Sequence, residues 1–150
     1  MTDSDLELDK QVCFALYAAS RAVTHLYRPV LDALGLTYPQ YLVMLVLWER
    51  GTSTVKFLGE ELDLDSGTLS PLLKRLETAG FVRRERSTTD ERCVEVHLTE
   101  TGAALRTRAS GVPRKFAGAT GMELVELAAL RQNLVRLTQQ VNAHRLTPDE

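Results

Sequence analysis

Residues 64–77 read LDSGTLSPLLKRLE, and this stretch decides the fold. Its leucines recur at helical spacing, while small hydroxyl residues and then two basic residues occupy the other face. We predict a helix from Ser66 to Ala79 that follows a tight turn and is stopped by Gly80. Its inner face is predicted to consist of Leu69, Leu72, Leu73 and Leu76.

The sequence on either side of this helix points to a DNA-reading unit. Residues 54–62 have the pattern of a short helix. Residues 81–86 and 93–98 read as two strands joined by a polar loop, as in a β-hairpin. Residues 54–80 alone would also suit an ordinary helical hairpin. The basic β-hairpin directly afterwards favours a helix-turn-helix followed by a wing.

The residue types on this unit suit DNA contacts. Small hydroxyl side chains at a helix N-terminus allow close approach to phosphates and base edges, and basic residues one turn later suit phosphate or guanine contacts. An arginine near the wing tip can enter a minor groove. The candidate DNA-binding residues are Ser66, Thr68, Ser70, Lys74, Arg75, Arg84, Arg86, Asp90 and Arg92.

Two more helices are expected before this unit. Asp9 is a candidate cap for a long first helix, which Pro29 should kink or break near Leu26 and which Gly35 ends. The second helix is expected over residues 38–50. Its start has a capping box, with Thr37 as the cap and Gln40 reaching back. Because this helix is apolar on nearly all sides, we expect it to be the central buried one.

The C-terminal third is predicted to end in an apolar seam. Thr99 or Thr101 caps a fifth helix that weakens near residues 111–113, and residues 117–121 read as a break. A final helix then repeats apolar residues at a spacing of three and four, a pattern that needs a partner helix. A dimer interface is favoured over cover within one chain. The seam consists of Leu127, Leu130, Leu134, Leu137 and Val141.

Composition excludes several classes of protein. A chain of 150 residues with 44% apolar and 25% charged residues suits one soluble domain. We expect no membrane association and a cytoplasmic location, because no apolar run is long enough to span a bilayer and the N-terminus is acidic. Two cysteines and three scattered histidines predict no disulfide framework, metal or cofactor. Net charge is −2, yet residues 66–92 carry six basic against four acidic residues.

Five segments resemble the MarR family of winged-helix regulators: residues 59–62, 64–77, 80–82, 90–92 and 98–102. The resemblance implies a mainly α fold with a small β-hairpin wing (α+β) in a single domain, 1–150. Residues 37–112 would form the DNA-binding lobe, and 1–36 with 113–150 the dimerisation helices. It also implies a homodimer on a pseudo-palindromic DNA operator.

The resemblance also implies roles for single residues. Arg92 becomes the minor-groove residue, oriented by a salt bridge from Asp90, while the candidate residues of the helix over 66–79 lie in or near the major groove. Phe57 departs from the family pattern, because relatives often have a glutamate there that supports the Thr54 cap.

Residues 12–21 and 26–44 resemble one subgroup of this family, the organic-hydroperoxide-sensing OhrR repressors. Cys13 is then the peroxidatic cysteine, and Tyr27 and Tyr38 hydrogen-bond its sulfur. Tyr17 lies one turn from Cys13 on the same helix face. Tyr27 lies 14 residues beyond Cys13, roughly 21 Å along a straight helix at about 1.5 Å per residue. The contact therefore needs a partner subunit or a sharply folded chain, whereas Tyr41 is expected in the core.

The expected chemistry is oxidation of Cys13 by an organic hydroperoxide acting as inducer. A helix N-terminus and phenol donors favour a thiolate, which becomes a sulfenic acid. Two-cysteine relatives resolve this acid with a cysteine directly before an Ala-Thr-Gly motif, but Gly118 precedes Ala119-Thr-Gly121 here. We expect the one-cysteine type, ending in a mixed disulfide with a low-molecular-weight thiol or in overoxidation. Cys93 is interpreted as an incidental wing thiol.

Two alternatives to a peroxide-sensing repressor remain open. The first is a MarR-type repressor that binds a small aromatic ligand, in which case Cys13 is structural only. The second alternative is an enzyme, a thiol peroxidase. The winged helix and the missing resolving cysteine oppose it, and we predict that the protein is not an enzyme.

Overall fold

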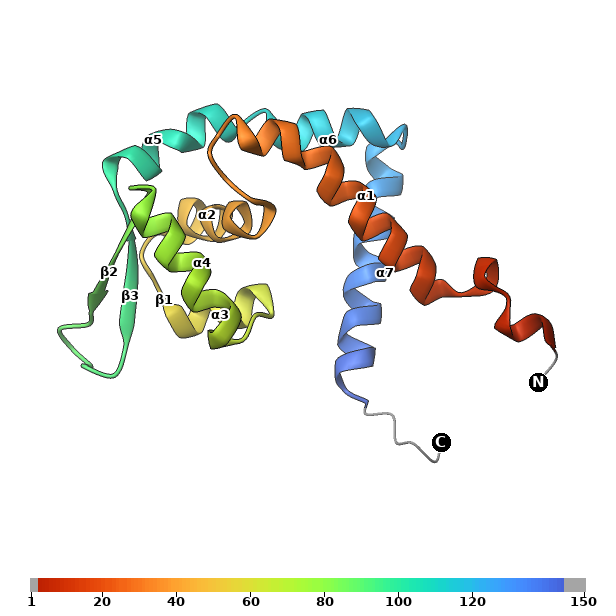
Figure 1. The fold of residues 1–150 in the computed structure, drawn as a ribbon, viewed down its shortest axis with the longest axis horizontal. Coiled ribbons are helices and arrows are strands. Elements are labelled where there is room, and N and C mark those ends of the chain that lie inside the picture. Colours follow the sequence, from red (N-terminus) through yellow and green to blue (C-terminus); the bar gives the residue numbers. More distant parts are fainter. Residues whose placement is uncertain (1–2, 145–150) are drawn as a thin grey trace. The chain divides into compact units, whose positions relative to one another are not determined.

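The computed structural model describes residues 3–144. It is mostly helical with one small sheet, so the predicted fold class is confirmed (Figure 1). Residues 1–2 and 145–150 of the predicted dimerisation segments lie outside the described residues. The elements in chain order are η1 (Asp3–Leu6), η2 (Leu8–Lys10), α1 (Val12–Asp32), α2 (Tyr38–Arg50), β1 (Ser53–Thr54), α3 (Val55–Leu62), α4 (Ser66–Thr78), β2 (Val82–Arg86), β3 (Val94–Leu98), α5 (Glu100–Ala109), α6 (Val112–Thr120) and α7 (Leu124–Asn142).

The predicted hairpin is part of a three-stranded antiparallel sheet in the order β1-β3-β2. Val82 pairs with Leu98 in the hairpin, and Ser53 of β1 pairs with Val96 on the other side of β3. The sequence did not predict β1, because two residues carry no periodic signal. Its effect is to tie the wing to the segment between α2 and α3.

The core lies between α2, α4 and the sheet. All four predicted inner leucines of α4 are buried, which confirms the helical pattern. The prediction that α2 is central also holds, since α2 contacts α1, α3, α4 and α5. The largest fully buried side chains are Leu31, Val43, Met44, Leu47, Leu58, Leu69, Leu73, Leu76, Val82 and Val96.

Side-chain caps fix where the helices of this body begin. Thr37 and Gln40 form the predicted capping box of α2, with Gln40 Oε1 accepting from the Thr37 amide at 2.9 Å. Thr54 Oγ1 accepts from the amide of Phe57 at 3.1 Å, so this cap of α3 persists without a glutamate at position 57. The Thr99 hydroxyl caps α5.

Two expectations for the first helix are wrong. Asp9 lies in η2, and α1 begins after Gln11, which makes no side-chain cap, so Cys13 is the second residue of the helix. The break expected at Pro29 is the second, since the helix continues through Pro29 to Asp32. Because Pro29 is exposed, water can satisfy the carbonyl that proline leaves without a donor. Gly35 ends the segment as expected, at a φ of 73°.

The chain divides into two compact units between Ser110 and Gly111. The second unit contains α6 and α7. The predicted break over 117–121 is wrong for its first four residues, which belong to α6, and right at Gly121, where φ is 67°. The final helix forms as α7, and none of its residues is buried. No described helix is long and apolar enough to cross a membrane.

Candidate nucleic-acid interface and thiol site

The exposed face of α4 carries all of its predicted DNA-binding residues. The cap residue Asp65 accepts a hydrogen bond from the amide of Thr68 at 2.7 Å. This bond, joined by one from the Thr68 side chain, lowers the pKa of the Asp65 carboxyl. The helix therefore starts at a fixed position with its polar side outward. The exposed residues are Ser66, Thr68, Ser70, Lys74 and Arg75.

The wing is held against α4 by a half-buried ion pair. The Arg84 guanidinium lies 3.3 Å from Glu77 Oε1, and the Arg84 amide donates to Glu77 Oε2 at 3.0 Å. Arg84 thereby lowers the pKa of the Glu77 carboxyl. The sequence placed Arg84 among the DNA contacts and missed Glu77. The geometry gives this arginine a structural contact as well.

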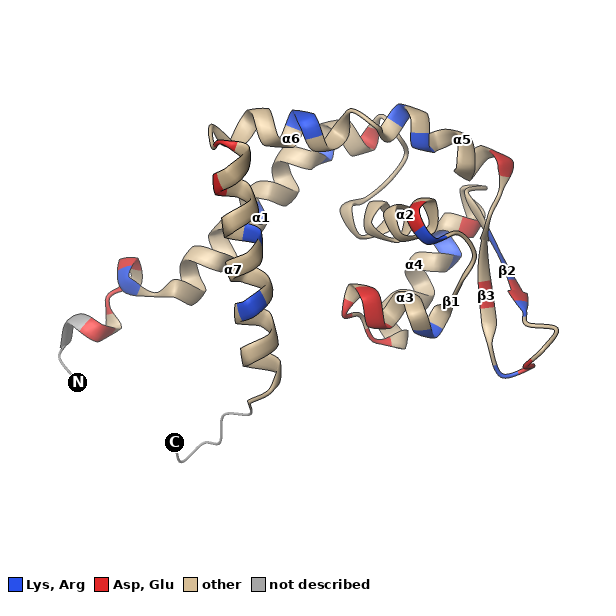
Figure 2. Cartoon of the chain, turned by 180° about the vertical axis from the view of Figure 1, so that it is seen from behind, with Lys and Arg blue, Asp and Glu red and all other residues tan. Residues whose placement is uncertain are grey.

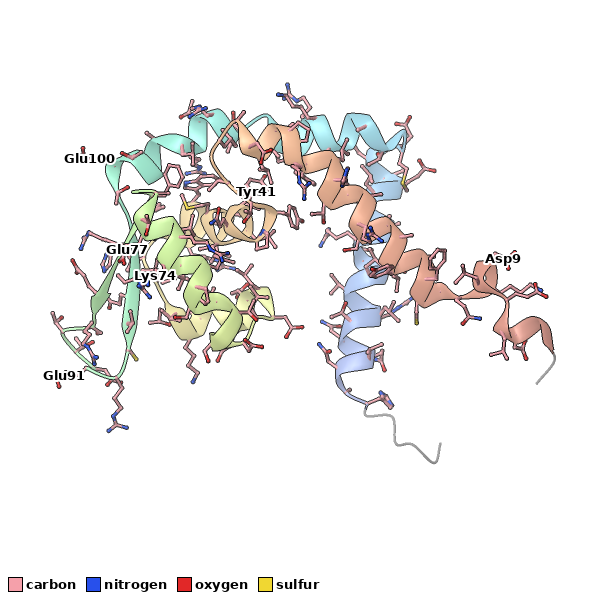
Figure 3. The ribbon with its side chains drawn as sticks, in the orientation of Figure 1. Asp9, Tyr41, Lys74, Glu77, Glu91 and Glu100 are labelled. Carbon is pink, nitrogen blue, oxygen red and sulfur yellow. The ribbon has the colours of Figure 1, made fainter. Side chains whose placement is uncertain are left out.

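At the wing tip, within the described residues, Asp90 makes other contacts than the expected salt bridge with the Arg92 side chain. Asp90 Oδ1 instead accepts from the backbone amide of Arg92 at 3.1 Å, and the Cys93 thiol donates to Asp90 Oδ2 at 3.6 Å. In so tight a turn the nearest donor to the carboxylate is the backbone, so Asp90 shapes the loop. The Asp90 charge raises the pKa of Cys93. Arg86 Nη1 donates to the Glu91 carbonyl at 3.2 Å, and Figure 3 shows Glu91 at the tip.

A groove of about 480 Å³ connects α3, α4 and the wing. It brings Ser70 of α4 together with Arg84, Arg92 and Cys93 of the wing, which are far apart in sequence. Lys56 lines the same groove and was missed, since it belongs to the helix before the reading helix. The wing carries basic and acidic residues together, while acidic residues gather on α3 (Figure 2).

Cys13 is exposed in the first turn of α1. Its neighbours are apolar and also exposed: the exposed fraction is 67% for Val12, 42% for Phe14 and 60% for Tyr17. The Arg21 guanidinium lies 5.5 Å from the centre of the Tyr17 ring. The Cys13 thiol therefore lies on an apolar helix face that is open to a further molecule.

Tyr27, near the C-terminal end of α1, packs against Tyr38, the first residue of α2. Their ring centres are 5.1 Å apart, and Tyr41 packs on both at 6.1 and 6.3 Å. Tyr41 is 3% exposed, as a core residue should be. Burial, followed by the neighbouring Tyr38 and Tyr41, raises the pKa of Tyr27 to about 12, and burial raises that of Tyr38. Both phenols therefore stay protonated near neutral pH and can donate.

The structure separates the predicted sensor residues into two groups. One continuous helix carries Cys13 and Tyr17 at its start and Tyr27 near its end, so Cys13 and Tyr27 of one chain do not meet. Trp48, which packs on Tyr41 at 6.4 Å, was missed because nothing local marks that contact. Residues 3–144 contain no cluster of three or more His, Cys, Asp or Glu side chains that could hold a metal.

Comparison with known proteins agrees with this architecture. Residues 25–107 match the family model of the transcriptional regulator SarA/Rot. The chain is 47% identical to the organic hydroperoxide resistance transcriptional regulator of Bacillus subtilis, over 91% of this chain and 93% of that one. It is 49% identical to the regulator TtmR of Methylorubrum extorquens, over 94% and 72%.

Solved structures of AbfR of Staphylococcus epidermidis share the fold. Reduced AbfR bound to DNA is 35% identical with a TM-score of 0.79, covering 95% of this chain and 98% of AbfR. Overoxidised AbfR, also bound to DNA, covers 94% and 99% with a TM-score of 0.75. Disulfide-formed AbfR covers 93% of each chain with a TM-score of 0.62. Fold and sequence agree, and the chain belongs to the MarR family of winged-helix transcriptional regulators.

Proposed function

We propose that this protein is a homodimeric DNA-binding repressor that releases its operator when an organic hydroperoxide oxidises Cys13. One observation carries the proposal: the exposed thiol of Cys13 lies at the start of α1, and the half-buried, protonated phenol of Tyr27, packed against Tyr38 of α2, lies near the other end of the same helix. The single chain therefore holds the two halves of a thiol site apart. A second copy can bring them together.

The DNA-reading part of the proposal rests on exposure and position. Exposed hydroxyl and basic side chains of α4 enter the major groove, and Arg92 reaches the adjacent minor groove. The two winged-helix units of a dimer contact two half-sites of a pseudo-palindromic operator. AbfR, which shares the fold, is bound to DNA in its reduced form, and this supports DNA binding by the present chain.

The dimer part of the proposal rests on apolar side chains that the single chain leaves exposed. The apolar seam of α7 includes Leu130, Leu134 and Val141, which are 43%, 38% and 60% exposed. Covering such a face with a second copy removes apolar surface from water. If the first helices of two copies cross antiparallel, Cys13 of one copy approaches Tyr27 and Tyr38 of the other, with Tyr17 beside the thiol. Each dimer then holds two thiol sites.

The chemistry at each site is a two-electron oxidation. The Cys13 thiolate forms an S–O bond to the peroxide as the O–O bond breaks, and the leaving alkoxide takes a proton to become an alcohol. A low-molecular-weight thiol then forms an S–S bond to the sulfenic acid and water leaves. Overoxidised AbfR is found on DNA, which favours the mixed disulfide as the releasing state here. A thiol kept reduced until challenged suits the cytoplasm.

The deciding experiment measures operator binding with and without cumene hydroperoxide plus free cysteine, for wild type, Cys13→Ser and Cys93→Ser. Wild type and Cys93→Ser should release DNA on oxidation, while Cys13→Ser should stay bound. If Cys13→Ser releases DNA as wild type does, Cys13 is not the sensor. Release on addition of a small aromatic acid, with Cys13 unreactive, would select the ligand-responsive alternative.

An Arg92→Ala variant separates reading from sensing. Loss of its phosphate or base contact should weaken operator binding by about 1–3 kcal/mol. The rate of Cys13 oxidation, followed by intact-protein mass, should remain that of wild type because Arg92 lies on the wing and Cys13 on α1. A loss of both properties would contradict the separation of reader and sensor.

A further inference from the structure

We propose that Trp48 is a positioning residue that links the tyrosine cluster to the base of the wing. Through it, a change at the thiol site alters the DNA-reading surface. The inference rests on the proposed function, because it explains how that site acts on the reader. It concerns a residue that lies neither on the DNA-facing surface of α4 nor beside Cys13.

The first half of the link is a run of packed aromatic rings. Tyr41 lies between the two site tyrosines and Trp48, with ring centres 6.1 Å from Tyr27, 6.3 Å from Tyr38 and 6.4 Å from Trp48. The Tyr41 and Trp48 rings meet edge to face, at 65°. Tyr41 is buried and packs against the other three rings, so a displacement of Tyr27 or Tyr38 presses on Tyr41 and through it on Trp48. Movement of Tyr27 or Tyr38 is therefore passed to Trp48.

The second half joins Trp48 to the wing. Its indole Nε1 donates to the carbonyl of Gly102 in α5 at 2.9 Å, a contact across 54 residues of sequence. Gly102 lies so tightly against the residue before β2 that a Cβ would overlap the carbonyl of Phe81. That same carbonyl accepts from the Thr99 amide at 3.1 Å. The indole is therefore bonded to the point where both wing strands are anchored.

This geometry explains how a local event could reach the DNA. Tyr27 and Tyr38 contact the oxidised sulfur in the proposed dimer, and a mixed disulfide adds a bulky group beside them. A shift of their rings displaces Trp48, and the hydrogen bond carries the shift to the wing base. A small displacement at the base becomes a larger one at the tip, where Arg92 lies. Packed elements with two alternative arrangements amplify sub-ångström changes in this way.

The test is the variant Trp48→Phe, which keeps an aromatic ring and removes the indole N–H. Operator dissociation constants are measured for the reduced and Cys13-oxidised forms of wild type and variant. We expect the oxidised-to-reduced ratio to fall at least ~5-fold in the variant, within the range of ordinary site-to-site coupling. Cys13 should oxidise at the wild-type rate. An unchanged ratio overturns the proposal.

Tyr41→Phe is the matched control, because it keeps the ring contacts and the indole bond and should preserve the wild-type ratio. A spectroscopic readout covers the case in which Trp48→Phe does not fold. Trp48 is the only tryptophan, so its emission and quenching by acrylamide report on this link. Both should change when wild type is oxidised and stay constant in Cys13→Ser. Unchanged fluorescence of oxidised wild type contradicts the link.

The outcomes separate the two proposals. If wild type keeps its DNA after oxidation, the proposed function fails and the link fails with it. If wild type releases DNA and Trp48→Phe shows the same ratio, only the link is wrong. If the ratio falls in Trp48→Phe and holds in Tyr41→Phe, both proposals stand.

Discussion

The helices α2 and α7 both carry many apolar residues, but they differ in how far the chain buries them. The shorter, α2, has 13 residues and buries five of them, whereas α7 has 19 and buries none. Helix α2 is satisfied by neighbours in its own unit. Helix α7 presents Leu130, Leu134 and Leu137 at its surface. The winged-helix unit is thus packed within its own unit, whereas α7 leaves an apolar face for the second copy that the proposed function requires.

Glycine substitutions probe this contrast most strongly. In Gly102→Ala the new Cβ overlaps the backbone of Phe81, so we expect a loss of about 4 kcal/mol or more. In Gly118→Ala, inside α6, the new Cβ meets nothing within 4 Å, so the helix should gain up to about 1 kcal/mol. Urea denaturation monitored by circular dichroism measures both. Similar changes in the free energy of unfolding for the two substitutions would contradict the contrast between the closely packed surroundings of Gly102 and the open surroundings of Gly118.

Leucine truncation gives the next largest effect. Leu73 is fully buried, and Leu73→Ala should cost about 2–5 kcal/mol at any protein concentration. Leu134→Ala removes a side chain that is 38% exposed, so its cost should depend on protein concentration, as expected when association supplies the stability. Sedimentation should show weaker dimers for Leu134→Ala alone. A loss that is independent of concentration would place Leu134 in a core of its own chain.

The smallest expected effect is on the loss of folding stability at low pH. Hydrogen bonds lower the pKa values of Asp65 and Glu77 from their ordinary 3.8 and 4.5. Their contribution is therefore present above those values and lost as the pH falls through the depressed ones. Asp65→Asn, which keeps a capping oxygen, and Glu77→Gln should each flatten the decline of stability below about pH 4. Thermal unfolding between pH 2 and 6 measures this, and an unchanged profile in both variants would assign the decline to other carboxylates.

Local rules predicted most of the winged-helix body. The inner leucines of α4 and the capping box of α2 follow from spacing and cap chemistry, and both are found. Three features escaped prediction for identifiable reasons. Strand β1 is too short for a period, Pro29 is tolerated because its turn is exposed, and α6 contains glycine and threonine that resemble a break.

The candidate site was predictable only in part. Helix arithmetic alone separated Cys13 from Tyr27 within one chain, and the unbroken helix agrees. The bonds of Asp90 could not be foreseen, since a carboxylate two residues from an arginine has its backbone amide as a competing partner. The Trp48–Gly102 bond joins residues 54 apart and leaves no pattern in the sequence.

The two edges of the sheet have a consequence for aggregation. On one side the sheet ends in β1, only two residues long, and on the other in β2, in which four charged residues follow Val82. Long, flat, apolar edges act as templates for adding strands from other molecules, and short or charged edges resist this. Copies of this chain can therefore accumulate without cross-β growth through the wing.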